Sequence, residues 1–348
     1  MLDKVKICIC GGGHIAHSLA AVLSDGGDAI SVYTRRPHLW ATTLAYEQGA
    51  LHSVHQSRGL LTVSNDVNIV NDSDCIIIAL PRFAICDVLS RLDKVLRKGQ
   101  TIIFIPAPAG LDVLAERFSR RGIDTIGFQR VPYVARTIRY GHAVWISDVR
   151  NVHRVAFSRN EIKSKWIGFF EGRLGGRVLE LSSFLSFTFS NSNPLLHPPR
   201  LVSLLHGGVE GGYDRCPYFY AEWTDESSGY YVAADAEMFK CFSAFDEASA
   251  RADYESAFDH YGVESTEELT SKIKGISSLK EILAPWRLSA SGLWEPDITS
   301  RYFTEDIPFG TKIIQEYAKK VGVATPVIDY LIEEIVKIAL CNKAGNGK

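Results

Sequence analysis

A histidine in a proline-rich segment is the residue of this chain best suited to proton transfer. His197 lies in the run Asn193 to Arg200, which reads Asn-Pro-Leu-Leu-His-Pro-Pro-Arg, and an imidazole exchanges protons near neutral pH. Far along the chain, the polar run Ser300 to Gly310 carries Arg301 and Asp306. We expect Asp306 to orient and polarise His197, and Arg301 to bind a substrate carboxylate through a bidentate pair. A lone histidine is more often structural, and spacing alone does not show that the two segments meet.

A glycine-rich turn near the N-terminus predicts a phosphate-binding site. The pattern Gly11-x-Gly13-x-x-Ala16 follows an apolar run and precedes a run of helical period, as in dinucleotide-binding turns. The first glycine permits the tight turn, the second lets the backbone approach a pyrophosphate, and the alanine allows close helix packing. Because the N–H groups that open the helix would face the phosphates, we assign His14 and Ile15 to the same cofactor site.

The residues after the second predicted strand indicate which dinucleotide is preferred. An acidic residue usually stands there when the ligand is NAD, because a carboxylate binds the ribose hydroxyls and repels a 2′-phosphate. This chain has Thr34-Arg35-Arg36 instead, which places a hydroxyl and two guanidiniums where a 2′-phosphate needs donors. We therefore expect NADP(H) to be preferred and NAD(H) to be the alternative. The competing interpretation is that both arginines are solvated loop charges.

Two further residues are assigned to the cofactor site by position. Pro81 follows an apolar run at the carboxyl end of a predicted strand, where the nicotinamide half would lie. Asn193 opens the proline-rich segment, where its amide could bind the nicotinamide or a substrate carboxylate. A turn role for Asn193 is equally consistent with the sequence.

The elements that must position these residues fall into two predicted domains. Val- and Ile-rich runs alternate with helical patterns up to about residue 130, which predicts an α/β, doubly wound parallel sheet of the Rossmann type. Short alternating runs over 133–147, 154–158 and 178–189 predict antiparallel additions to that sheet. The pattern beyond residue 193 is mostly helical. We predict a dinucleotide-binding domain over residues 1–185 and an all-α substrate and catalytic domain over residues 186–348.

Composition excludes several classes of protein. Lys plus Arg is 38 and Asp plus Glu is 40, so the net charge is -2, and no basic footprint for nucleic acid is present. The seven cysteines are scattered without metal-ligand spacing, and they indicate reduced thiols rather than a disulfide framework. No apolar run is long enough to span a membrane, and the first predicted strand begins at about Lys4. We expect a cytoplasmic protein without a bound metal, a nucleic-acid partner or a membrane anchor.

Three of these segments together resemble a known family. The Gly-Gly-Gly-His-Ile-Ala turn at 11–16, the Asn-Pro-x-x-His-Pro segment at 193–198 and the run Arg-Tyr-Phe-Thr-Glu-Asp-Ile-Pro-Phe-Gly at 301–310 resemble the octopine/nopaline dehydrogenases, the opine dehydrogenase family. The resemblance implies reductive condensation of an amino acid with a 2-oxo acid such as pyruvate or 2-oxoglutarate, using NADH or NADPH. It also implies a Rossmann domain followed by a helical domain, with His197 as catalytic general acid/base, Asp306 as its partner and Arg301 beside them.

Two alternatives stay open at this point. A reductase of a simple 2-oxo acid, with no amine substrate, would also need a histidine, a carboxylate and an arginine. A non-catalytic NADP(H)-sensing protein would need the glycine turn but no proton relay. The sequence identifies neither the amino acid nor the 2-oxo acid, and it leaves the oligomeric state open, a homodimer included.

Overall fold

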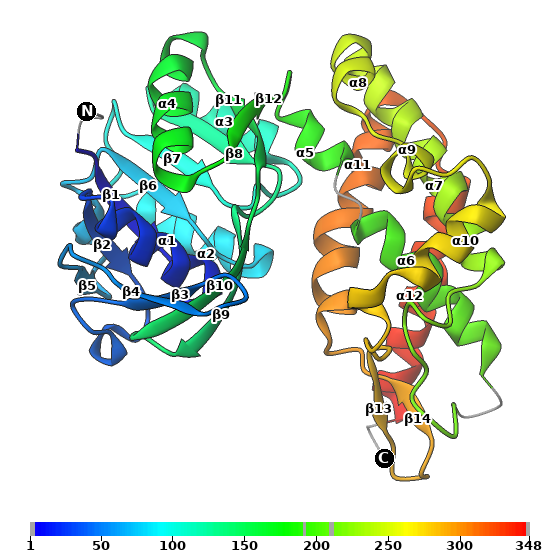
Figure 1. Ribbon diagram of the computed structural model, residues 1–348. Helices are drawn as coiled ribbons and strands as arrows, with labels where there is room; N and C mark the ends of the chain where they lie inside the picture. The colour runs from blue at the N-terminus through cyan, green and yellow to red at the C-terminus, as the bar shows by residue number, and fades with distance from the viewer. Residues whose placement is uncertain (1–3, 191–192, 209–211, 346–348) are drawn as a thin grey trace. The chain divides into compact units, whose positions relative to one another are not determined.

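The chain forms two compact units, Met1–Phe187 and Thr188–Lys348. The computed structural model describes residues 4–190, 193–208 and 212–345 (Figure 1). The boundary between the units lies two residues from the position predicted above. An N-terminal Rossmann-like parallel sheet is followed by a helical unit, so the predicted fold class is confirmed.

The first unit is built on a mainly parallel sheet that has eight strands within the described residues, in the order β12-β11-β8-β7-β6-β1-β2-β5. Strands β8, β7, β6, β1, β2 and β5 all run parallel to one another. Strand β11 is antiparallel to β8, and β12 is parallel to β11. Strand order reverses on either side of β1, so a ligand crevice is expected beyond its carboxyl end. The strands are β1 (Lys6–Cys10), β2 (Ala29–Tyr33), β5 (Thr62–Ser64), β6 (Cys75–Ile78), β7 (Thr101–Phe104), β8 (Asp124–Phe128), β11 (Val152–Phe157) and β12 (Arg177–Glu180).

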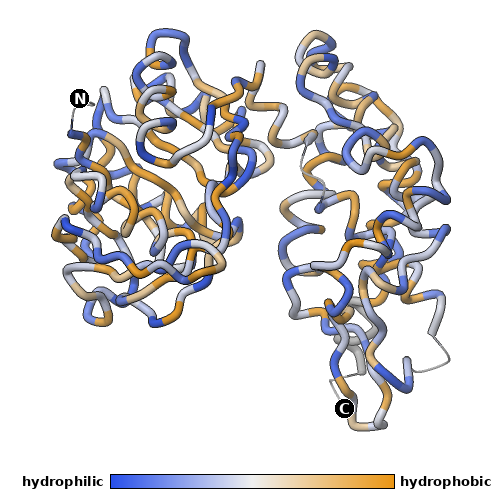
Figure 2. The backbone as a smooth tube through the Cα atoms, viewed as in Figure 1, coloured by the Kyte–Doolittle hydropathy of each residue, from blue (hydrophilic) through white to orange (hydrophobic). Residues whose placement is uncertain are grey.

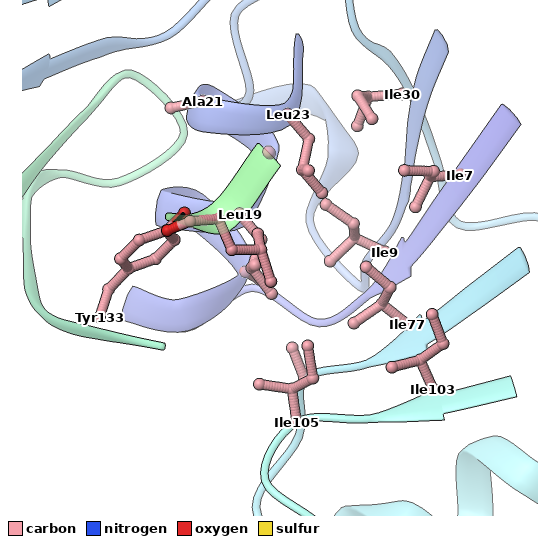
Figure 3. Close-up of a cluster of buried hydrophobic side chains, with 14 of the residues drawn as sticks. Ile7, Ile9, Leu19, Ala21, Leu23, Ile30, Ile77, Ile103, Ile105 and Tyr133 are labelled. Atoms are coloured by element: carbon pink, nitrogen blue, oxygen red, sulfur yellow. Dashed lines mark hydrogen bonds between the residues drawn. The ribbon is translucent and has the colours of Figure 1, made fainter. Parts of the chain in front are cut away.

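Apolar side chains cover both faces of this sheet, because helices pack on each side. The central strands are largely hydrophobic along their length (Figure 2). On one face, isoleucines of β1, β6 and β7 meet Leu19 and Leu23 of α1 (Figure 3). On the other face, Cys8 and Cys10 join a second apolar cluster. The helices of this unit are α1 (His14–Asp25), α2 (Arg82–Leu92), α3 (Leu111–Ser119), α4 (Lys163–Leu174) and the short α5 (Leu185–Phe189), which extends into the second unit.

A second, smaller sheet corrects the prediction that all the later strands extend the main one. Strands β9 (Tyr133–Arg139) and β10 (Ala143–Val149) form a hairpin that joins β3 (Ala45–Gln48) and β4 (Ser53–Gln56) in the order β4-β3-β10-β9. The hairpin buries one face against α1 rather than offering an edge to the main sheet. Strands β11 and β12 do make the expected addition to the main sheet, because β11 is antiparallel to β8 and β12 runs parallel to β11.

The predicted run over 178–189 is also shorter as a strand than expected. Strand β12 ends at Glu180, and residues 185–189 form α5. The Ser183 hydroxyl accepts a hydrogen bond of 3.1 Å from the backbone N–H of Leu185. A serine at the start of a helix satisfies one of its unpaired N–H groups, so the chain turns into a helix there.

The described residues of the second unit form helices and one hairpin, β13 (Trp286–Leu288) with β14 (Trp294–Pro296). Helix α6 packs against α7, α12 and a π-helical segment, Tyr302–Thr311. The prediction of an all-α domain therefore omitted this small hairpin. The helices are α6 (Asn193–Gly207), α7 (Asp225–Phe245), α8 (Glu247–Asp253), α9 (Ala257–Tyr261), α10 (Thr266–Gly275), α11 (Lys312–Val321) and α12 (Pro326–Gly345) (Figure 1).

Candidate cofactor site and active site

The glycine turn lies between β1 and α1, and its geometry leaves room for a ligand. Gly11 has φ +154°, and a Cβ there would lie 2.5 Å from the Ala79 carbonyl oxygen, so a side chain is excluded. A Cβ on Gly13 would meet nothing within 4 Å. Gly13 also opens α1 without a side-chain cap, so the first N–H groups of the helix remain available to an anion.

A cavity of about 490 Å³ opens at this turn. Six of the predicted cofactor residues line it: Gly11, Gly13, Thr34, Arg35, Arg36 and Pro81. The other lining residues are Cys10, Gly12, Tyr33, Asn65, Ala79, Leu80, Phe83, Ala84, Asp87, Val88, Arg91 and Tyr140. A pocket of this size at the strand-order reversal suits a nucleotide.

The other predicted cofactor residues are not among the side chains that line this cavity. His14 Nδ1 accepts a hydrogen bond of 2.9 Å from the Thr137 backbone N–H, so its ring is directed to β9. Ala16 is fully buried, and Ile15 packs on the apolar core. Asn193 is exposed at the start of α6, in the second unit.

Arg36 has an aromatic partner that sequence reasoning missed. Its guanidinium carbon lies 4.2 Å from the centre of the Tyr140 ring, and the Tyr140 hydroxyl is 3.5 Å from Thr34 Oγ1. Burial raises the pKa of Tyr140, but hydrogen bonds with Thr34, Trp40 and Arg36 outweigh burial, so that pKa is lowered. Three polar groups therefore converge at one end of the cavity.

A buried histidine ties the glycine turn to the hairpin that carries Tyr140. His17 Nδ1 donates a hydrogen bond of 2.8 Å to the Gly13 carbonyl, and its Nε2 accepts one of 2.7 Å from the Gly141 backbone N–H. The ring also stacks on Trp40 at 4.2 Å. Burial lowers the pKa of His17, partly opposed by the Gly13 carbonyl. The neutral imidazole is thus a bridge between two backbone turns, which helical periodicity alone could not reveal.

In the second unit, the structure brings His197 and Asp306 together. The distance from His197 Nδ1 to Asp306 Oδ2 is 2.7 Å, and His197 is 7% exposed. His197 Nε2 lies 3.0 Å from the Tyr220 hydroxyl. A carboxylate only accepts, so Nδ1 carries the proton, and Nε2 then accepts from the phenol. The pair has the orientation that acid/base catalysis requires of an imidazole and its carboxylate.

Proline and glycine residues explain why these two distant segments can meet. Pro198 has no N–H, so the Pro194 carbonyl loses its partner within α6. That carbonyl instead accepts a hydrogen bond of 2.7 Å from the Thr311 hydroxyl. A Cβ on Gly310 would overlap the Pro194 ring, so only glycine permits this approach. The two segments are therefore fitted to each other in backbone as well as in side chains.

Arg301 does not contact His197 directly. Its Nε lies 2.6 Å from Glu305 Oε2, and its Nη2 also contacts that oxygen. Glu305 is buried, whereas the Arg301 side chain is 78% exposed. The ion pair engages the Nε and Nη2 edge of the guanidinium. The predicted contact with a substrate carboxylate therefore depends on the remaining N–H donors of Arg301.

Arg136 and His206 occupy structural or surface positions. Arg136 donates to the backbone carbonyl of its neighbour Ala135. His206 forms ion pairs with Glu226 at 3.5 Å and with Glu334 at 3.6 Å, as a surface residue rather than a cap. Among the residues that the structure describes, no group of three metal-ligating side chains is present, and no helix is long and apolar enough to cross a membrane.

Comparisons with known proteins give family matches in both parts of the chain. Residues 180–339 match the family described as NAD/NADP octopine/nopaline dehydrogenase, alpha-helical domain, and residues 6–108 match that described as NADP oxidoreductase coenzyme F420-dependent. The chain is 24% identical to tauropine dehydrogenase of Arabella iricolor, over 96% of this chain and 91% of that protein. It is 23% identical to octopine dehydrogenase of Pecten maximus, over 99% and 94%.

Solved structures show the same fold. An octopine dehydrogenase in complex with NADH and agmatine has a TM-score of 0.82 at 20% identity, covering 97% of this chain and 90% of that one. A yersinopine dehydrogenase with NADP⁺ bound has a TM-score of 0.75 at 15% identity, covering 100% and 94%. Both nicotinamide cofactors are therefore represented among proteins of this architecture.

Proposed function

We propose a mechanism from the premise that the chain belongs to the opine dehydrogenase family, the NAD(P)-dependent oxidoreductases that act on CH–NH bonds. The reaction joins the amino group of an amino acid to a 2-oxo acid through an imine, which is then reduced. The observation that carries the mechanism is the hydrogen bond of 2.7 Å between His197 and Asp306 in the second unit. A sensing protein would need no such buried acid/base pair.

The residues of the glycine turn fit the dinucleotide that this reaction requires. Gly11 keeps the turn free of side chains, and the open space at Gly13 lets a pyrophosphate approach the start of α1. When bound there, the reduced nicotinamide supplies the hydride that reduces the imine.

His197 is the general acid/base of the proposed reaction. Its neutral imidazole takes up the proton that the substrate ammonium loses, which leaves a free amine able to attack the 2-oxo carbon. The same proton returns to the resulting hydroxyl, which then departs as water and leaves the imine. Asp306 stabilises the imidazolium that exists between these two transfers, because its carboxylate faces Nδ1.

Arg301 is proposed to bind a substrate carboxylate. Both substrates of the reaction carry one, and a guanidinium matches it with parallel N–H donors. Glu305 contacts the Nε and Nη2 edge of Arg301, so it orients the side chain while the other donors remain for substrate.

The convergence of Thr34, Arg36 and Tyr140 at one end of the cavity supports a preference for NADP(H) over NAD(H). Arg35 and Arg36 are exposed at the cavity edge, where a 2′-phosphate can reach them. Stacking on Tyr140 orders the Arg36 guanidinium before the ligand arrives. The competing interpretation, that both arginines are only solvated charges, predicts equal affinity for the two cofactors.

Buried free thiols support a cytoplasmic location. Cys8, Cys10 and Cys75 are all buried and unpaired as disulfides. Free cysteines of this kind persist in reducing compartments.

A substrate panel tests the proposed function. The chain is incubated with NADPH or NADH, pairs of amino acids and 2-oxo acids, and the product is identified by mass. We expect a secondary amine whose mass equals the two substrates minus water plus two hydrogens. Cofactor oxidation at full rate without any amino acid would instead establish the simple 2-oxo acid reductase.

A further inference from the structure

The hydroxyl of Tyr220 is hydrogen-bonded to His197 Nε2, which is the ring nitrogen that must exchange protons with substrate. Asp306 holds Nδ1, and the Tyr220 hydroxyl lies 3.0 Å from Nε2. Both nitrogens of the imidazole are therefore engaged, since a neutral histidine has one donor and one acceptor. A substrate can reach the proton of His197 only if Tyr220 moves away or carries the proton itself.

The surroundings of Tyr220 favour a fixed ring over a movable one. Tyr220 is 7% exposed, its ring stacks on Trp223 at 6.3 Å, and the edge of Phe219 lies against it at 4.9 Å. Close packing on these faces opposes rotation of a large side chain. Tyr302 packs at 4.5 Å from the imidazole ring and interacts with the Tyr220 hydroxyl.

The backbone that carries Tyr220 is held by a buried arginine. Arg200 is 3% exposed, and its Nε and Nη2 donate to the carbonyls of Phe219 and Tyr218 at 2.8 and 3.1 Å. Burial lowers the pKa of Arg200 to about 10. Burying a charge is costly unless its donors are satisfied. The Arg200 guanidinium therefore fixes the backbone immediately before Tyr220.

From this arrangement we propose that Tyr220 is the proton-relay residue of the active site, passing protons between His197 and the reacting atoms of the substrate. The inference rests on the proposed function and adds the group that touches the substrate. Tyr302, beside the same hydroxyl, is a positioning residue in this scheme. Burial, with the nearby Tyr302, raises the pKa of Tyr220 well above its usual value, so the phenol stays neutral at rest.

The relay balances without forming a lasting phenolate. In the first transfer, the Tyr220 O–H proton passes to His197 Nε2 as the phenol oxygen takes a proton from the substrate ammonium. In the second transfer, the Tyr220 O–H proton passes to the departing hydroxyl as Nε2–H returns its proton to the phenol oxygen. His197 begins and ends neutral, the hydroxyl leaves as water, and the hydride comes from the nicotinamide.

The substitution Tyr220→Phe tests the relay, because it keeps the packed ring and removes only the hydroxyl. Tyr254→Phe is the matched control, since it also deletes a buried phenol hydroxyl of the same unit, one that donates to Asp235 Oδ1 at 2.6 Å. We expect kcat to fall by about 100-fold in Tyr220→Phe and to change little in Tyr254→Phe. Affinity for NADPH and the thermal unfolding temperature are measured for both variants.

Two readouts separate a relay from a merely structural role. In mixtures of H₂O and D₂O, two protons in flight give the wild-type rate a curved dependence on the deuterium fraction, whereas Tyr220→Phe gives a linear one. In addition, the double variant Tyr220→Phe with His197→Ala is expected to be no slower than His197→Ala alone, because both residues act in one relay.

Other outcomes overturn the relay. A Tyr220→Phe enzyme whose kcat stays within about threefold of wild type, or is raised, would show that the phenol only covers Nε2. A slower variant with an unchanged curved dependence, or additive losses in the double variant, would assign Tyr220 a structural role. Wild-type protein that forms no condensation product with any substrate pair contradicts the proposed function itself, before the variants are compared.

Discussion

Two buried histidines, one in each unit, differ in what holds them. His17 in the first unit is 0% exposed and bonds to two backbone groups, the Gly13 carbonyl and the Gly141 N–H. His197 in the second unit is 7% exposed and bonds to two side chains, Asp306 and Tyr220. In both rings Nδ1 donates and Nε2 accepts, so burial and tautomer do not distinguish them.

The chemistry of the partners does distinguish them. Backbone amides neither take up nor release protons in this pH range, so the His17 imidazole can only connect the elements that contact it. A carboxylate stabilises an imidazolium, and a phenol can exchange a proton with it, so His197 can cycle between charge states. A buried histidine is therefore a catalytic candidate when its partners are titratable and a structural one when they are not.

The largest expected effect separates the two histidines by turnover. His197→Ala is expected to lower kcat by about 10⁴-fold, because the general acid/base is lost, while affinity for NADPH changes little. Steady-state kinetics and cofactor titration by fluorescence measure both quantities. Normal turnover in this variant would remove the mechanism and the contrast with His17.

Removal of the charge beside His197 is expected to have the next largest effect. Asp306→Asn keeps the size of the side chain but no longer stabilises the imidazolium, so we expect kcat to fall by about 100-fold or more. KM for the substrates should change much less than kcat. Equal turnover by wild type and variant would mean that the carboxylate is only a structural partner.

His17→Ala is expected to act on stability rather than chemistry. It leaves the buried Gly13 carbonyl and Gly141 N–H without partners, at about 1–3 kcal/mol for each group. Thermal unfolding should show a less stable first unit, and NADPH should bind more weakly because the glycine turn loosens. His55→Ala, at an exposed site on β4, is the control. A large loss of kcat at saturating cofactor and unchanged stability would contradict the structural assignment of His17.

Replacing Arg35 and Arg36 with Ala tests which of the two cofactors the first unit prefers. Each charge-assisted hydrogen bond to a phosphate contributes about 1.5–3 kcal/mol, so affinity for NADPH should fall by roughly 10- to 100-fold. Affinity for NADH should be nearly unchanged, since that ligand lacks the 2′-phosphate. Isothermal titration with both cofactors makes the measurement, and unchanged NADPH binding would show that the arginines are solvated charges.

The smallest expected effect is a pH dependence of stability in the first unit. Burial lowers the pKa of His17 and His153 below the usual 6.5. The unfolded chain therefore binds more protons than the folded one just below pH 6.5. The stabilisation is complete above that pH and is lost as pH falls toward the folded-state values, by about 1.4 kcal/mol per unit of lowered pKa.

Thermal unfolding at pH 7.5 and at pH 5.5 checks this sign. His17→Ala should show a smaller difference between the two pH values than wild type. An equal difference in both proteins would mean that His17 does not contribute to acid sensitivity.

Local patterns indicated the elements that carry the glycine turn. The strand, glycine turn and helix around Gly11 are adjacent in the chain, so period and residue type sufficed, and six assigned residues do line the cavity. The pairing of His197 with Asp306 was implied by resemblance to a family. The roles assigned to His197, Asp306 and Arg301 stay predictions until the variants are measured.

Contacts between distant segments could not be predicted in the same way. The hairpin of β9 and β10 was expected in the main sheet, but packing against α1 places it in a separate sheet and brings Tyr140 onto Arg36. The sequence around Tyr220 is rich in aromatic residues, and nothing in its composition singles out one hydroxyl. Arg301 was assigned to substrate without its partner Glu305, although the two are four residues apart.

The sequence by itself determined the parallel sheet, the glycine turn and the helical character of the second unit, because each depends on residues within about one element of each other. Tertiary structure decided that the ring nitrogens of His17 bond to backbone groups and that His197 also meets Tyr220. Asp306 is 109 residues from His197, and Gly141 is 124 residues from His17. Such long-range contacts depend on packing and on single backbone features, such as the missing N–H of Pro198 and the missing side chain of Gly310, rather than on periodicity.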